Sequence, residues 1–314
     1  MSRLVLLAIV IIIAICTTIN CNYDVKKLDE TPTRGSINIS VDESYSQIID
    51  AELDVFHNLY KYAKVTPKYT NEDSIFKDLL TRRARVIVAN RRLDSITENS
   101  LKIDSAIYIK TVRFAYDAIA FITNNSNPDS LMQYPTVKDI FEGKVSDWKQ
   151  INPKSKLGKL TLVFDNNKSC NTRYFREKFK IQNKFPDYCR AVNSNEEVIN
   201  YVEKNPNAIG ILSVNWISDR EDSLSITFLK RFKVVSFTSE MDPTGNDYYG
   251  PYQAYIQTKS YPFIRDVYLI SRESFQGLGT GFSAFVAGEK GQRIVKLSGL
   301  LPATMPIRII QIKN

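Results

Sequence analysis

Apolar and polar positions alternate along the chain in a pattern that predicts strands followed by helices. Segment 36–41 alternates as a strand does, and segment 44–63 then carries apolar residues at helical spacing. Strand-like runs at 64–69 and 85–89 frame a second helix, predicted to begin near Thr70. This order is typical of a doubly wound α/β sheet with parallel strands.

Two of these predicted helices begin with residues that favour helix N-termini. Ser44 and Gln47 match a capping box, which places the first helix start at Ser44. Thr70 and Asn71 are good caps for the second helix, and acidic residues follow them. The polar residues therefore predict where the chain passes from strand to helix.

The pattern continues with two strand-like segments in 105–123 and restarts after residue 125. A short helix is predicted to end near Gly143, and a helix followed by a strand occupies 195–214. A third block begins near residue 228. Two α/β units thus alternate along the chain; their other predicted strands are 159–164 and 264–271, and two helices follow in 279–301.

The first twenty residues have the features of a signal peptide. Arg3 precedes an unbroken apolar run of 13 residues, shorter than the about 20 residues that span a bilayer. Cys21 follows, as the lipidated cysteine of a bacterial lipoprotein does, although Thr18 and Asn20 depart from the usual box. Residues 21–35 would then form a polar tether. An ordinary secreted protein and an uncleaved anchor remain alternatives.

Composition and charge narrow the class of partner. The 314-residue chain is 43% hydrophobic and 24% charged, which is a globular composition for about two domains. Its net charge of +8 falls to +7 without residues 1–20, whose only charge is Arg3. This mild excess favours anionic ligands or membrane surfaces. The basic residues are dispersed without a nucleic-acid-binding motif, so we expect no nucleic acid partner.

Histidine and cysteine usage limits the chemistry further. The only histidine, His57, lies in the first predicted helix, where a helix-surface position is the simplest interpretation. A Ser-His-Asp triad could use only this residue, and zinc sites with several histidines are excluded. We expect no enzymatic activity, no cofactor and no metal. Cys170 and Cys189 could form a disulfide in an exported chain, a pairing that the sequence leaves open.

Loops of small polar residues follow three predicted strands, at 41–46, 68–73 and 164–171. Ligands of doubly wound sheets collect at the carboxyl ends of the strands. Helix N-termini at this edge present unpaired amides and the positive end of the helix dipole. Arg91 could add positive charge, and Arg173 lies in a first helical turn, where a nearby anion would stabilise it. The loops therefore predict an anion-binding site.

At this point several segments, in order, resemble the periplasmic phosphate-binding proteins of ABC transporters. The strongest marker is DIFEGKVSDW at 139–148, similar to the IFxGKxxxW segment of that family. The resemblance covers nearly the whole mature chain. It implies a type II periplasmic-binding-protein fold with a ligand cleft between two α/β lobes, lobe I at 36–118 and 228–314 and lobe II at 119–227.

The resemblance also implies a function and a set of ligand-binding residues. A monomeric, lipid-anchored protein on the periplasmic side of the cell envelope would capture an oxyanion by lobe closure, and the closed form would dock on an ABC transporter permease. Phosphate is the expected anion, with sulfate as an alternative. The residues implied in binding, together with Arg173, are Ser44, Tyr45, Thr70, Asn71, Asn90, Arg91, Ser169, Cys170, Asn171 and Thr172.

Three positions depart from the family pattern. Where the family has an aspartate that accepts the proton of phosphate, this chain has Asn90 or Arg91. Where the family has an arginine before its SGTT loop, this chain has Asp165, and Cys170 replaces the glycine of that loop. Arg91 and Arg173 could restore positive charge, and such a site would also suit sulfate. The departures support a second hypothesis, an envelope scaffold or sensor lipoprotein that has lost tight phosphate binding and acts through protein partners.

Overall fold

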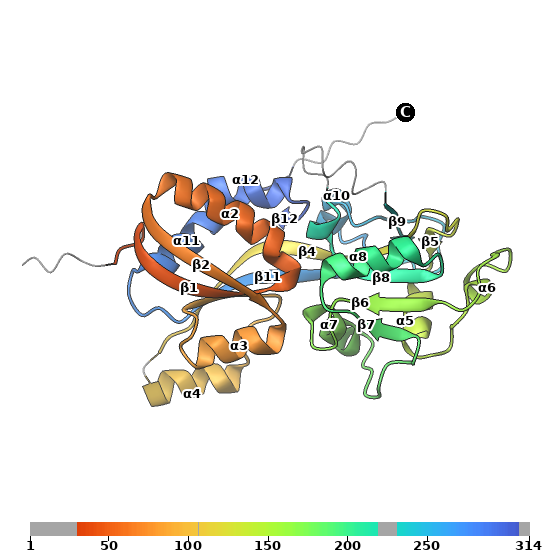
Figure 1. Ribbon diagram of the computed structural model, residues 1–314, viewed down its shortest axis with the longest axis horizontal. Helices are drawn as coiled ribbons and strands as arrows, with labels where there is room; N and C mark the ends of the chain where they lie inside the picture. Colours follow the sequence, from red (N-terminus) through yellow and green to blue (C-terminus); the bar gives the residue numbers. More distant parts are fainter. Residues whose placement is uncertain (1–29, 106, 219–230, 308–314) are drawn as a thin grey trace, which may run out of the picture.

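The computed structural model describes residues 30–105, 107–218 and 231–307. The predicted signal peptide, Cys21 and most of the predicted tether lie outside these residues. Within the described ranges, no helix combines the length and apolar character needed to cross a bilayer. Figure 1 shows an elongated molecule with an α/β lobe at each end and long strands running between them.

Lobe I is a sheet covered by helices on both faces. Strands β1 (Arg34–Asp42), β2 (Tyr62–Thr70) and β3 (Val86–Ala89) are parallel, with β1 in the middle. In Figure 1, α2, α11 and α12 lie on one face of the sheet, and α3 and α4 lie on the other. The bounds of these helices are Ser46–Leu59 for α2, Glu72–Leu80 for α3, Ser95–Ser105 for α4, Leu278–Ala287 for α11 and Glu289–Leu297 for α12.

Two antiparallel strands connect the lobes. β4 (Lys110–Asn124) is one continuous strand, and β11 (Ile264–Ser271) pairs with its first half. The prediction of two strand-like segments in 105–123 is wrong, because the polar residue Asp117 does not break the strand but is buried against Arg265. The expected sheet of parallel strands is also corrected, since β4 and β11 run antiparallel to their neighbours.

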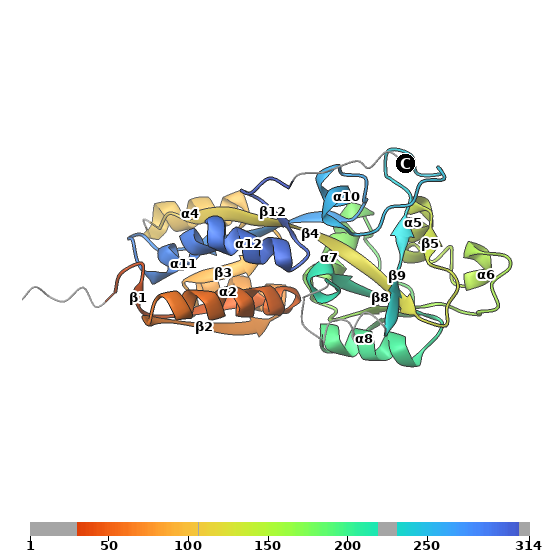
Figure 2. The same cartoon turned by 90° about the horizontal axis from the view of Figure 1, so that it is seen from above.

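Lobe II extends the same sheet beyond β4 through β8, β6 and β7 in that order. Helix α8 packs on one face, and α5 and α7 lie on the other, as the two views in Figures 1 and 2 show. Phe141 of α5 and Phe175 of α7 stack with their ring centroids 4.5 Å apart. The bounds are Tyr134–Phe141 for α5, Trp148–Ile151 for α6, Thr161–Phe164 for β6, Cys170–Lys178 for α7, Cys189–Ala191 for β7, Asn195–Lys204 for α8 and Ala208–Ser213 for β8.

The segment after residue 230 stays with lobe II before it returns to lobe I. Strand β9 (Phe232–Val234) pairs with the distal end of β4, and β10 (Ser236–Phe237) pairs with β5 (Leu131–Met132). The strand pairing thus favours a later return than residue 228, and we propose that lobe I resumes at β11. The remaining elements are η2 (Val214–Trp216), α10 (Gln253–Gln257) and β12 (Leu301–Pro302).

The predicted helix start is confirmed at the junction before α3 and is wrong at the junction before α2. Asn71 caps α3, because its side chain accepts a hydrogen bond from the amide of Ser74. The expected capping box of Ser44 and Gln47 is wrong, since a 3-10 turn, η1 (Glu43–Tyr45), precedes α2. Asp42 caps this turn by accepting from the Ser44 amide at 3.0 Å. The hydroxyl of Ser44 is therefore left to face lobe II.

Candidate functional site

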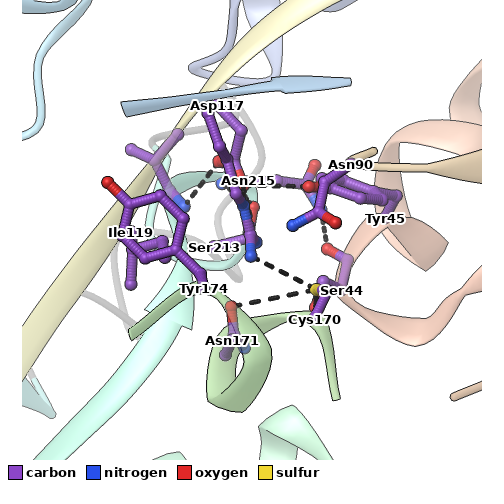
Figure 3. A network of polar contacts seen from close by, with 12 residues as sticks. Ser44, Tyr45, Asn90, Asp117, Ile119, Cys170, Asn171, Tyr174, Ser213 and Asn215 are labelled. Atoms are coloured by element: carbon purple, nitrogen blue, oxygen red, sulfur yellow. Dashed lines mark hydrogen bonds and ion pairs between the residues drawn. The ribbon is translucent and has the colours of Figure 1, made fainter. Parts of the chain in front are cut away.

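Four strand-to-helix junctions meet where the two lobes face each other. η1, the start of α3 and the end of β3 form the lobe I side, and the start of α7 forms the lobe II side. The Ser44 hydroxyl lies 3.4 Å from the Cys170 sulfur, and Arg173 Nη2 donates to Asn90 Oδ1 at 2.5 Å. Figure 3 shows Ser44, Asn90, Cys170 and Asn171 gathered at this point.

A cavity of about 200 Å³ remains between the junctions. Three residues implied by the family resemblance, Thr70, Asn71 and Ser169, line it. The sequence interpretation did not include the remaining lining residues in the binding site, although all but Asn193 lie within the predicted loops 41–46, 68–73 and 164–171. Three of them are carboxylates. The remaining lining residues are Asp42, Glu43, Tyr69, Asp165, Asn166 and Asn193.

The thiol of Cys170 fills the space beside Ser44. Arg265 Nη1 donates to the Cys170 sulfur at 3.2 Å, and the thiol lies 3.3 Å from Asp42 Oδ1. Burial raises the pKa of Cys170 well above its usual value, so the group stays a neutral thiol that can donate to Asp42. Cys189 is partly buried in β7, and both cysteines of the described chain are free thiols, so no disulfide joins them.

Arg265 and Asp117 form a buried ion pair where they lie opposite each other on the paired strands β11 and β4. Arg265 Nε donates to Asp117 Oδ2 at 2.8 Å. Asp117 also accepts from the Ser213 hydroxyl at 2.8 Å and from the Tyr45 hydroxyl at 3.3 Å. The hydroxyl of Tyr45 is thus held at this ion pair, and Tyr45 is not among the residues that line the cavity. Sequence reasoning missed Arg265, although an arginine inside the strand-like run 264–271 was a signal that could have found it.

Glu72 holds both arginines that were expected to face an anion. Its Oε1 accepts from Arg91 Nε at 2.7 Å, and its Oε2 accepts from Arg173 Nε at 2.6 Å. Arg173 also donates to Glu177 at 2.6 Å, and Glu72 is only 2% exposed. Neither arginine is among the residues that line the cavity. In this arrangement the protein's own carboxylates therefore balance both guanidinium charges.

Asn171 and Thr172 fold back on the loop that precedes α7. Asn171 Nδ2 donates to Asp165 Oδ1 at 3.1 Å, and the Thr172 hydroxyl donates to the carbonyl of Asn166 at 2.7 Å. Ser169 caps α7 by accepting from the amide of Thr172. These contacts fix the loop that carries Asp165 at the wall of the cavity.

The carboxylates of the cavity are hard to ionise. Burial and then the charge of Asp165 raise the pKa of Asp42 to about 6 and that of Glu43 to about 7. Burial likewise raises the pKa of Asp165 itself. The Oδ2 atom of Asp42 is buried and has no hydrogen-bond partner among the described residues. The cavity is therefore lined by carboxyl groups whose charged forms are disfavoured by burial, and the charge of Arg265 offsets this only in part for Asp42 and Asp165.

Further polar contacts join the lobes around this site. The side-chain amide of Asn195 donates to Glu43, which links the start of α8 to η1. The carbonyl of Ser44 accepts from Asn215 Nδ2 at 3.2 Å and from Trp216 Nε1 at 3.1 Å. The lobes are thus closed on each other by hydrogen bonds that surround the cavity.

Comparison with known proteins agrees with this architecture. A family described as the PBP superfamily domain matches residues 29–290. The phosphate-binding protein PstS of Borreliella burgdorferi is 22% identical over 303 residues, which cover 93% of this chain and 98% of that protein.

Solved structures with the same fold match nearly all of the described chain. A Clostridium perfringens protein solved with bound phosphate is 21% identical, with a TM-score of 0.71. A phosphate transport receptor of the ABC type from Vibrio cholerae is 19% identical, with a TM-score of 0.62. Each alignment covers 86% of this chain and 100% of the other chain. The chain therefore belongs to the PBP superfamily, has the type II periplasmic-binding-protein fold, and is similar along almost its whole length to PstS.

Proposed function

We propose that this protein is an extracytoplasmic solute-binding protein that captures an oxyanion, with phosphate as the first candidate, for uptake by an ABC transporter. One observation carries the proposal: polar junctions from both lobes converge on one cavity of about 200 Å³. The relatives named for phosphate binding or phosphate transport support the choice of anion. Binding would involve no covalent chemistry.

The chemistry of capture follows from the groups at the junctions. Asn71 and Ser169 cap the amides of Ser74 and Thr172, which leaves the earlier first-turn amides of α3 and α7 without an intrahelical acceptor. Both helices begin at the cavity wall. The hydroxyl of Ser169 and the side chain of Asn71 lie beside them. An anion that entered would compete with Glu72 for Arg173, so binding and rearrangement of this pair would be coupled.

Thermal unfolding with and without oxyanions tests the proposal. Phosphate at 100 times its dissociation constant is expected to stabilise the protein by about 2.7 kcal/mol, because it binds only the folded state. Sulfate run in parallel tests the alternative anion, and chloride at matched ionic strength is the control. An unfolding temperature that responds to no oxyanion at any concentration would contradict the capture of anions.

A second candidate function is favoured by the way protein side chains occupy the meeting point of the lobes. Cys170 fills the space beside Ser44, and Glu72 already pairs with Arg91 and Arg173. A protein closed in this way without a ligand could serve as an envelope scaffold or sensor that acts through protein partners. A closed conformation in solution together with no response to oxyanions would favour this candidate.

We also propose that the protein is anchored to a membrane through lipid on Cys21. The support is the apolar run before this cysteine and the polar segment after it. Membrane fractionation of cells that express the wild type or Cys21→Ala tests the proposal. The wild type should sediment with membranes and the variant should not; equal distribution of both would contradict lipidation at Cys21.

A further inference from the structure

Strand β2 lies at one edge of the large sheet. Among the described residues it pairs with β1 alone, in parallel along its whole length. Figure 2 shows it at the rim of lobe I, beside α2. The backbone groups on the outer side of an edge strand have no strand partner, and folded proteins block them because they could pair with another chain.

Three alternate positions of β2 are blocked on this outer side, each in a different way. The amide of Ala63 donates to the carbonyl of Tyr60 at 3.0 Å, and the amide of Val65 donates to Nε2 of His57 at 3.0 Å. Both amides therefore point away from β1. Pro67, two positions further along the strand, has no amide hydrogen.

The bond from Val65 depends on the protonation state of His57. The ring is partly buried in the last turn of α2, beside the ring of Phe56. A neutral imidazole accepts through Nε2 when Nδ1 carries its proton, whereas both nitrogens of a protonated ring are donors. The Val65 amide can therefore keep this acceptor only while His57 is neutral.

We propose that His57 is a pH-sensitive cap on the free edge of β2, which holds the Val65 amide when neutral and releases it when the protein is acidified. This inference goes beyond the proposed function, because it does not involve the cavity. Val65 is only 2% exposed, so water has little access to replace the lost acceptor. Protonation should therefore loosen β2 where it packs on the end of α2.

The surroundings of the ring favour its neutral form. Burial lowers the pKa of His57 below 6.5, and Asp54 on the same helix opposes this shift. Asp54 is the only charged group of the described chain that acts appreciably on the ring. The other charged groups on α2, on the turn that follows it and on the elements that pack against it are Asp50, Glu52, Lys61, Arg34, Asp42, Glu43, Lys64, Lys68, Glu289, Lys290, Arg293 and Lys296.

The sign of the pH effect follows from this lowered pKa. On acidification the unfolded chain takes up the proton of His57 before the folded protein does. The stability that the cap contributes is therefore complete above about pH 6.5 and is lost progressively as the pH falls below this value.

An NMR titration of the mature protein, prepared without a histidine tag, tests this inference. His57 is the only histidine of the chain, so its ring signals are unambiguous. The ring should titrate with a pKa below 6.5 and carry its neutral proton on Nδ1. Protection of the Val65 amide from hydrogen exchange, corrected for the intrinsic effect of pH, should fall about tenfold or more between about pH 7.5 and about pH 5.

Two variants separate the cap from other effects of acid. His57→Gln keeps an acceptor that does not titrate, and its Val65 amide should stay protected at both pH values. Lys61→Gln removes an exposed charge from the adjoining turn and should behave as the wild type does.

The titration of the wild type decides the proposal even if His57→Gln is unstable. A pKa of 6.5 or above, or equal protection of Val65 at both pH values, would overturn the cap. A loss of protection that the amides of β3 share equally would indicate general acid unfolding and would also overturn it. The same loss in His57→Gln as in the wild type would show that another group titrates.

Discussion

Glu72 is the single side chain to which both expected anion-binding arginines are attached. Its two oxygens accept from Arg91 and Arg173 at 2.7 and 2.6 Å, and the residue is buried. Its carboxylate thus stands where an anionic ligand could form the same charge-assisted hydrogen bonds. At the scale of the residue, this internal carboxylate and an external anion would compete for the same two guanidinium groups.

Glu72→Gln should therefore raise phosphate affinity. The neutral amide leaves both guanidinium groups available to the anion, and we expect a gain of about tenfold, or about 1.4 kcal/mol. Calorimetric titration of the variant and the wild type measures the change. Glu177→Gln is the matched control, since Glu177 is largely exposed and contacts only Arg173 of this pair of arginines. A loss of affinity in Glu72→Gln would show that Glu72 positions the arginines for the anion instead.

Glu52 lies inside lobe I without a partner and makes stability depend on pH. Both of its carboxylate oxygens are buried and have no hydrogen-bond partner among the described residues, and burial raises its pKa from 4.5 to about 9. The unfolded chain releases the proton above about pH 4.5, whereas the folded protein retains it until about pH 9. Glu52 thus lowers the free energy of unfolding progressively as pH rises through this window.

Glu52→Gln should remove this pH dependence. The variant should be more stable than the wild type by about 2–4 kcal/mol at pH 8, with a much smaller difference at pH 5. Denaturant unfolding at both pH values measures the free energies. Asp54→Asn, an exposed substitution on the same helix, is the control and should leave the profile unchanged. A wild-type stability that rises between pH 5 and pH 8 relative to Glu52→Gln would contradict the assignment.

At the scale of the element, a buried pair of charges lies between the paired strands β4 and β11. Arg265 and Asp117 face each other across these strands, and Asp117 also accepts from Tyr45 and Ser213. A buried ion pair adds little net stability, but the loss of one partner leaves an isolated buried charge. The pair therefore fixes how the two strands align beneath the site.

Arg265→Met should lower the free energy of unfolding by about 3–5 kcal/mol, because Asp117 would lose its charged partner. Denaturant unfolding measures this loss. Arg113→Met provides the control, since Arg113 forms a more exposed pair with Asp266 on the same two strands. Similar losses in both variants would show that the buried pair has no special role.

Most elements could be predicted from the sequence because their signals are local. The strand-like runs at 36–41 and 85–89 lie in β1 and β3, and Asn71, one of the two predicted caps, is the N-cap of α3. The prediction of two strands in 105–123 was wrong, since β4 is one strand that buries the polar residue Asp117 against Arg265, 148 positions away. The capping box failed because Asp42, outside the predicted motif, caps the turn before α2.

The candidate site was predictable only as a location. Strand ends and helix starts mark the edge where junctions meet, so Thr70, Asn71 and Ser169 were found from the pattern and the resemblance. Which charges balance one another was not predictable, since Glu72 reaches Arg173 across the lobe interface over 101 positions. Contacts between the lobes form only when the lobes close, and the spacing of residues along the sequence does not predict them.

At the scale of the whole molecule, the candidate site lies where contacts join the two lobes. Arg173 in lobe II reaches Glu72 and Asn90 in lobe I, and Asn195 in lobe II donates to Glu43 in lobe I. These contacts join the two lobes beside a cavity that a small ligand could enter. Closure and binding should therefore be linked through Arg173.

Arg173→Ala should weaken phosphate binding by about 2–5 kcal/mol, as loss of one partner of a buried charged contact does. Calorimetric titration measures the affinity. Arg176→Ala, three positions later in α7, is the control because Arg176 bonds to the carbonyl of Asn183 and packs on Phe185 away from the cavity. Unchanged affinity in Arg173→Ala would exclude Arg173 from the binding site.

A crystal structure of the mature protein grown with saturating phosphate tests the central claim most directly. The account predicts a tetrahedral anion in the cavity beside Asn71 and Ser169, with Arg173 turned from Glu72 toward the anion. A closed cavity that holds no anion under these conditions, with Glu72 still joined to Arg91 and Arg173, would contradict the capture of an oxyanion between the lobes.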